Sequence, residues 1–165
     1  MKALKVLEVK TFMSKLFLTE AFDTFLLCEL EIQTANQYKI NGRISRKWYD
    51  SDELEKLGDR EYSVWKEMRN FAFQIIKGSK SPQSMKIVFS LPKENVKKVL
   101  EKSGTDFRIE QVEGLFLNIK YEKGELYLIT GSSINVFSMD KALEQEWDEE
   151  ILIFLKKCNI PCEEI

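Results

Sequence analysis

A repeated pattern of apolar residues is the feature that most limits how this chain can fold. Leu4 and Val6 alternate as in a short strand, and the segment from Val9 to Phe17 carries apolar residues at the spacing of an amphipathic helix. A second alternation runs from Leu26 to Ile32, turns at Ala35-Asn36 and returns from Tyr38 to Gly42. This order predicts a β-α-β-β unit.

The same order of patterns returns in the second half of the chain. Ile87 and Phe89 alternate, and Pro92 suits the first turn of a helix because its missing N–H leaves no donor unpaired there. An apolar helix face from Val96 to Leu100 follows, and then another hairpin pattern. The pairs that correspond in the two copies are Leu4/Ile87, Val6/Phe89, Lys10/Lys93, Met13/Val96, Leu16/Val99, Phe17/Leu100, Leu26/Leu115, Cys28/Leu117, Leu30/Ile119, Ile32/Tyr121, Tyr38/Tyr127, Ile40/Ile129 and Gly42/Gly131.

Each copy is expected to add a third strand, at Phe71–Ile75 in the first and at Ile134–Phe137 in the second. The chain then closes with a helix whose core face is Trp147, Ile151, Phe154 and Leu155. The sequence therefore predicts an α+β fold of duplicated β-α-β-β-β units, with two helices packed on an antiparallel sheet, plus a C-terminal helix. The expected organisation is a single domain, 1–165, with a first half at 1–78, a second half at 84–139 and the helix at 140–158.

Two resemblances follow from these patterns. The succession of two β-α-β-β-β units resembles the domain plan of DNA sliding clamps, in topology only. The whole chain also resembles a family of uncharacterised bacterial proteins, through Met1-Lys2-Ala3-Leu4-Lys5-Val6, through Asp59-Arg60-Glu61-Tyr62-Ser63-Val64-Trp65-Lys66-Glu67 and through Leu115-Phe116-Leu117-Asn118-Ile119-Lys120-Tyr121. That resemblance runs the full length and implies no activity and no site residue.

The chain contains no histidine in 165 residues, which narrows the chemistry open to it. Histidine is the usual general base, triad member and transition-metal ligand of enzymes. The run Gly78-Ser79-Lys80-Ser81 lacks the first glycine of a phosphate-binding loop, so we interpret it as a turn. The sequence therefore assigns no catalytic residue and makes an enzyme the less favoured class.

Charge and cysteine content point away from several kinds of ligand. A formal net charge of −2 gives no general attraction to nucleic acid or to anionic membranes. The longest apolar run, Ile151–Leu155, is far shorter than the roughly 20 residues of a membrane span. Cys158 and Cys162 have the spacing of zinc ligands, but the chain offers no second pair. We therefore expect a cytoplasmic protein with reduced thiols and without a metal, cofactor or membrane contact.

The segment from Arg43 to Arg69 interrupts the repeat and is the first candidate for a binding site. Arginine and large aromatic residues, which dominate binding hot spots, gather there together with acids. The alternative is that its tryptophans anchor the excursion to the core while its charges face water. The candidate binding residues are Arg43, Arg46, Trp48, Tyr49, Arg60, Tyr62 and Trp65, and a short helix is expected at Asp52–Leu57.

A lysine-bearing helix face is the second candidate. Lysines on the solvent side of the two repeated helices could contact phosphates, as helices of sliding clamps do, although Glu94 and Glu101 dilute the charge. The residues of this face are Lys10, Lys15, Lys93, Lys97 and Lys98. We expect weak or no binding of nucleic acid here.

Two functions from different classes remain. The favoured one is a non-catalytic binding or interaction module with a clamp-like fold, whose partner could be another protein. The alternative is a divalent-metal-dependent phosphoesterase, because carboxylates can hold Mg²⁺ without histidine. Its acids would be Asp50, Asp52, Glu53, Asp59 and Glu61.

Overall fold

The computed structural model describes residues 1–165. The strands are β1 (Ala3–Val6), β2 (Leu26–Gln33), β3 (Gln37–Asn41), β4 (Ser84–Ser90), β5 (Val112–Glu122), β6 (Glu125–Ile134) and β7 (Cys162–Glu164). The helices are α1 (Val9–Leu18), α2 (Ser51–Leu57), α3 (Trp65–Ile76), α4 (Lys93–Ser103) and α5 (Ala142–Lys157). Two short 3₁₀ turns, η1 (Arg46–Trp48) and η2 (Ile109–Gln111), complete the set.

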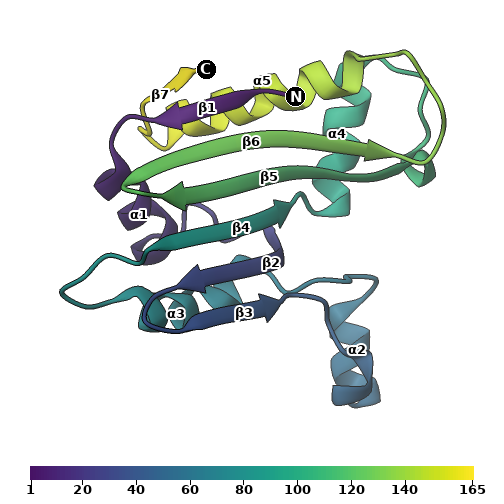
Figure 1. Ribbon diagram of the computed structural model, residues 1–165. Coiled ribbons are helices and arrows are strands. Elements are labelled where there is room, and N and C mark those ends of the chain that lie inside the picture. The colour runs from purple at the N-terminus through teal and green to yellow at the C-terminus, as the bar shows by residue number, and fades with distance from the viewer.

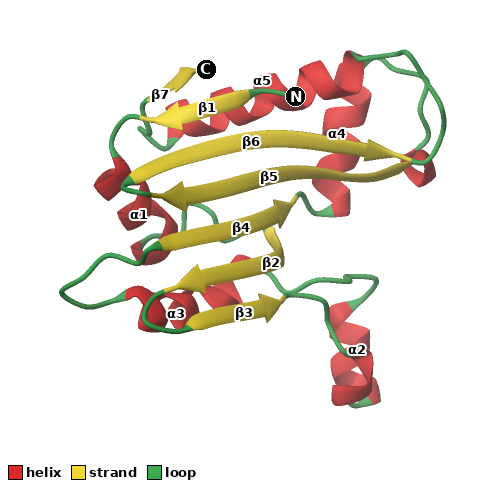
Figure 2. Ribbon diagram, viewed as in Figure 1, coloured by secondary structure: helices red, strands yellow, loops and turns green.

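All seven strands form one antiparallel sheet in the order β3-β2-β4-β5-β6-β1-β7. Helices α1, α3, α4 and α5 cover the same face of this sheet, while α2 projects away beyond the end of β3 (Figures 1 and 2). The opposite face of the sheet carries no helix. None of the helices is both long enough and apolar enough to cross a membrane.

The predicted α+β fold with an antiparallel sheet and a C-terminal helix is confirmed, and so is the order β-α-β-β in each half. The first half supplies β1-α1-β2-β3 and the second supplies β4-α4-β5-β6. The strand neighbours differ, however, because β4, β5 and β6 are adjacent whereas β1 is separated from β2 and lies beside β6. The duplication itself stays a prediction.

The prediction of a third strand in each unit is wrong. Phe71–Ile75 belongs to α3, in which Trp65 and Ala72 face the core and Phe71 is 65% exposed. The alternation of Phe71, Phe73 and Ile75 suggested a strand, but residues 65, 68, 72 and 76 follow the helical spacing. In the second unit Ile134 only ends β6, and Phe137 lies in the loop that follows.

The core is rich in aromatic residues and lies between the sheet and its helices. Phe25 stacks on Phe89 with ring centroids 5.4 Å apart, and Phe22 contacts both rings. Trp65 is fully buried, and its indole N–H donates to the carbonyl oxygen of Leu16 at 2.9 Å. This bond ties α3 to α1 across the core.

A β-bulge in β2 lies near the segment Arg43–Arg69, which we call the excursion. The register of β2 against β4 shifts between Leu27 and Glu29, so Cys28 leaves the expected face and Leu27 joins Leu30 in the core. Beyond the bulge, the segment 61–64 lies between the start of β2 and the continuation of β3. The amide of Leu27 donates to the Ser63 carbonyl at 2.8 Å, and the amide of Ser63 donates to the Gly42 carbonyl at 2.9 Å.

Candidate functional site

Two central strands of the sheet end earlier than their neighbours. β2 begins at Leu26 and β4 ends at Ser90, and these two residues pair with each other. Ser90 also pairs with Phe116 of β5, but β5 begins four residues earlier, at Val112. The sheet therefore has a notch beyond Leu26 and Ser90, between β5 and the segment that leads to α3 (Figure 1).

The notch opens into a cleft with a volume of about 860 Å³. We call this the notch cleft. One wall is the segment from Leu57 to Val64, a second is Leu91–Lys97 at the start of α4, and the third runs from η2 into β5. Apolar side chains such as Leu26, Val96 and Ile109 lie among charged ones, as in many ligand sites.

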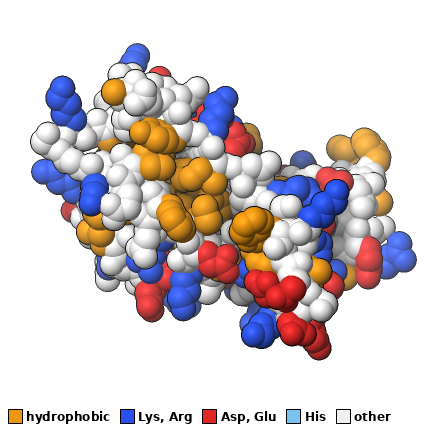
Figure 3. Space-filling model, turned by 90° about the horizontal axis from the view of Figure 1, so that it is seen from below, with side chains coloured by type: hydrophobic (Ala, Val, Ile, Leu, Met, Phe, Trp, Pro, Cys, Tyr) orange, Lys and Arg blue, Asp and Glu red, His pale blue; other side chains and the backbone are white.

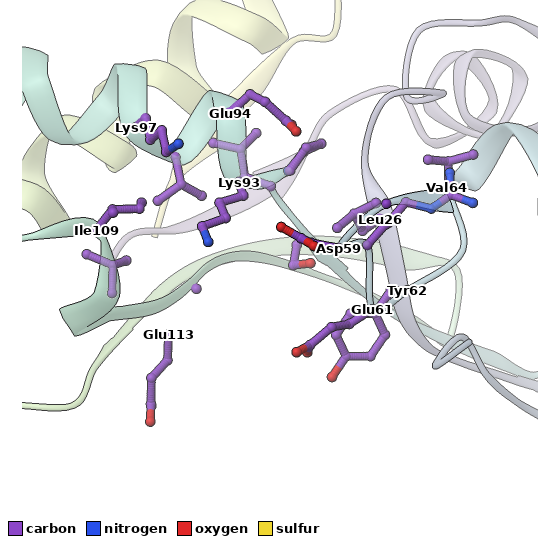
Figure 4. Close-up of a pocket in the computed structure, with 18 of the residues that line it drawn as sticks. Leu26, Asp59, Glu61, Tyr62, Val64, Lys93, Glu94, Lys97, Ile109 and Glu113 are labelled. Carbon is purple, nitrogen blue, oxygen red and sulfur yellow. The ribbon is translucent and has the colours of Figure 1, made fainter. Parts of the chain in front are cut away.

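Acids outnumber basic residues in the notch cleft. The acids are Asp59, Glu61, Glu94, Glu110 and Glu113, and the basic residues are Arg60, Lys93 and Lys97. None of these five acids forms an ion pair, and neither lysine does. Figure 4 shows Glu61 and Glu113 pointing toward the same mouth of the cleft and Lys93 projecting into it. The lining is thus charged but not internally neutralised.

Arginines of the excursion position the first wall. Arg46 donates to the carbonyl oxygens of Gly58 at 2.9 Å and Arg60 at 3.4 Å, so it joins the start of the excursion to the residues that follow α2. Arg60 donates to Glu67 at 3.2 Å, while its Nε is buried without any acceptor. Most buried donors in proteins are paired, so a ligand that offered an acceptor to the Arg60 Nε–H would gain a stabilising hydrogen bond.

The structure separates the candidate binding residues into four groups. Arg60 and Tyr62 line the notch cleft. Arg43 lies over the Tyr62 ring, 5.3 Å from its centroid, and donates to its hydroxyl at 3.3 Å, so it supports that wall from outside together with Arg46. Trp48 is 83% exposed and Tyr49 is half-buried, and neither lines the cleft. Trp65 belongs to the core and is closed to a surface ligand.

The expected basic face is not one surface. Lys93 and Lys97 line the notch cleft, whereas Lys98 lines a smaller cavity of about 240 Å³ between α4 and α5. Lys10 and Lys15 lie on α1, which packs against α3 rather than α4, and Figure 1 shows α1 at the other end of the sheet. The clamp-like row of lysines is therefore absent.

The acids of the metal-dependent alternative do not come together. The backbone amide of Glu53 donates to the Asp50 carboxylate at 2.8 Å, and the Glu53 side chain accepts from the Asp50 amide at 3.2 Å. This capping box begins α2, and the amide of Glu53 holds the pKa of Asp50 below its usual range. Asp59 and Glu61 line the notch cleft instead. No group of three or more acids and cysteines in the chain could hold a metal ion.

A second surface of interest is apolar. Figure 3, seen from the β3 side, shows hydrophobic side chains gathered over α3 and the outer strand β3. Phe71 is 65% and Tyr38 39% exposed, and Ile40 and Ile75 are half-buried. β3 pairs only with β2, so its outer edge is open. Nothing in the structure shows what covers this face.

Residues of the third wall, above all Glu113 and Phe116, were not expected from the sequence to belong to a site. Their role depends on where β4 stops relative to β5. The one local signal is Ser90-Leu91-Pro92, because proline cannot donate in a strand ladder and so favours the strand ending before it.

Comparison with known proteins agrees with the resemblance seen in the sequence. No curated protein and no solved structure matches the chain. A model of a family of unknown function, DUF5721, matches residues 15–163, which include all three walls of the notch cleft. The chain therefore belongs to this family of unknown function.

Proposed function

We propose that the protein is a non-catalytic binding module and that the notch cleft holds its ligand. The observation that carries the proposal is the notch itself, in which three separate segments bring unpaired charges and apolar side chains around one opening. The apolar floor of the cleft is continuous with the core, since Val96 belongs to the core and Ile109 and Val112 pack against it, whereas the acids and lysines around the opening take no part in the core. An apolar floor with a few polar groups converging on it is the usual form of a ligand site.

The charges of the cleft indicate the class of ligand. Five carboxylates against three basic groups disfavour a polyphosphate backbone, so nucleic acid is not the proposed ligand. A protein partner agrees better with a mixed lining of charged and apolar groups. The clamp-like arrangement is not part of the proposal, because the third strand of the first unit is a helix. The cytoplasmic location expected from the sequence stays a prediction.

The phosphoesterase is the weaker candidate. Its acids are divided, because Asp50 and Glu53 form the α2 capping box whereas Asp59 and Glu61 line the cleft. Hydrolysis with a metal requires several oxygen ligands around one ion. We therefore keep the binding module as the conclusion.

A fragment screen with matched variants tests the proposal. Mixtures of small amino-acid, carboxylate, sugar and nucleotide fragments are screened against the protein by ligand-observed NMR. Lys97→Trp places a large side chain on the cleft wall, whereas Lys98→Trp places it one residue away, outside the cleft. Fragments that bind the natural protein are expected to bind Lys98→Trp as well, but not to bind Lys97→Trp. Equal binding to both variants, or no fragment bound, would contradict the proposal.

A further inference from the structure

One wall of the notch cleft is the open edge of a strand. The last β5 residue paired with β4 is Phe116, and the last hydrogen bond on that side runs from the amide of Leu91 to the carbonyl of Leu115 at 2.9 Å. Val112 and Gly114 pair only with β6, and Glu113, between them, has no partner residue in either strand. Unpaired strand edges accept a further strand through their backbone groups.

The space beside this edge suits an added strand. Two strands, β2 and β4, are missing between β5 and the segment 61–64, and adjacent strands lie about 4.8 Å apart, so the opening is roughly 14 Å wide. One extended chain paired with β5 would fill about a third of that width. Its side chains and ordered water would occupy the rest.

The mouth of the cleft is acidic on both sides of this space. Glu61 and Glu113 are exposed, stand on opposite walls and point toward the same mouth, with the Tyr62 ring beside Glu61 (Figure 4). Glu113 accepts from the Ser133 hydroxyl at 2.5 Å and has no cationic partner. A lysine or arginine side chain on the added strand would meet both carboxylates.

We propose that the occupant of the notch cleft is an extended peptide segment of a partner protein, which pairs with β5 at Glu113 and directs a basic side chain between Glu61 and Glu113. This inference rests on the proposed function and names its ligand. Backbone pairing supplies affinity, and the two carboxylates and the apolar floor at Leu26 supply selectivity.

Selection from a peptide library tests the inference. Random octapeptides displayed on phage are selected on the natural protein and depleted on Lys97→Trp. The enriched peptides are expected to carry one lysine or arginine among β-branched and aromatic residues. In the best synthetic peptide, N-methylation of the amides that face β5 should weaken binding about tenfold, because each loses a backbone hydrogen bond. N-methylation of the intervening amides should weaken it less.

Protein variants test the acidic mouth. Glu61→Gln combined with Glu113→Gln is expected to weaken the basic peptide about fivefold, since two exposed ion pairs are lost. Glu101→Gln, an exposed acid of α4 outside the cleft, is the control and should leave affinity unchanged. Enrichment of acidic peptides, no enrichment, or equal loss at both sets of amides would overturn the inference. If fragments then still bind Lys98→Trp but not Lys97→Trp, the notch cleft remains the ligand site, and only the extended peptide is refuted as its ligand.

Discussion

The guanidinium of Arg46 holds the carbonyl oxygen of Gly58 at 2.9 Å, which closes the excursion into a loop beside the notch cleft. The remaining contacts of this wall are made farther along it, by the amide of Ile44 donating to Glu61 at 2.8 Å and by Arg43 donating to Tyr62 at 3.3 Å. Arg46 is therefore a positioning residue, although its position in the sequence suggested direct binding.

Arg46→Ala should loosen the wall without unfolding the protein. The lost bonds are exposed, so we expect the amides of Ile44 and Ser63 to exchange with deuterium about fivefold faster, measured by NMR. Core amides such as Ile119 should keep their rates. Lys47→Ala, an exposed neighbour without a side-chain hydrogen bond, is the matched control and should change neither set. Unchanged exchange in Arg46→Ala would contradict the positioning role.

The buried pair of Arg69 and Asp23 joins α3 to the loop after α1. Arg69 Nε and Nη2 donate to the two carboxylate oxygens of Asp23 at 2.9 and 3.0 Å, and the side chains are 18% and 9% exposed. Arg69→Met and Asp23→Asn should each lower the free energy of unfolding by about 3 kcal/mol, because each leaves its partner unpaired. In urea unfolding, the loss of unfolding free energy in the double variant should be smaller than the sum of the two single losses by about 1 kcal/mol or more. Additive losses would show that the pair is not coupled.

Gly42 and Gly131, which correspond in the two copies of the repeat, differ in how closely other atoms approach them. A Cβ added at Gly42 would lie 1.7 Å from the carbonyl oxygen of Leu27, whereas one at Gly131 would meet nothing closer than 3.9 Å. Gly42→Ala should cost about 3 kcal/mol and lower the Tm by about 6–12 °C, since backbone must move. Gly131→Ala is the control, with a Tm near that of the natural protein. Similar Tm values for both variants in calorimetry would refute the close approach at Gly42.

Cys162 should react slowly with alkylating agents in the folded protein. Burial raises the pKa of its thiol to about 11, so at pH 8 only about one thiol in a thousand is ionised. The rate of iodoacetamide labelling, followed by mass spectrometry, should rise about tenfold per pH unit from 8 to 10. The higher folded pKa also means that stability falls as pH rises from about 9 toward 11. Labelling in guanidinium, where the thiol is unburied, is the control, and equal rates would contradict the burial.

Sequence patterns predicted the repeated order of elements because Leu4–Val6, Val9–Phe17 and their counterparts bury one face at a clear period. They failed at α3, where Phe71, Phe73 and Ile75 fit a strand. Arg69 obscured the helical period there, since it faces inward only because Asp23 pairs with it. β7 was missed because a three-residue edge strand with two exposed glutamates has no apolar signal.

The candidate site was predictable only in part. The excursion around Arg60 and Tyr62 stood out by composition and does form one wall. The other walls depend on the register of β4 against β5 and on the early start of β2 at the Cys28 bulge. Register and bulges are set by packing between distant segments, so Glu113 and Lys93 could not be brought together from their places in the chain.

The claim that the notch cleft is the ligand site is tested most directly by mapping amide chemical shifts of the ¹⁵N-labelled protein as the best fragment or peptide is added. The largest changes are expected on all three walls, at Tyr62, Lys93 and Glu113, while the amides of β3 and of the Phe137 loop keep their chemical shifts. Largest changes at Tyr38 and Phe71, on the apolar face of β3 and α3, would contradict it.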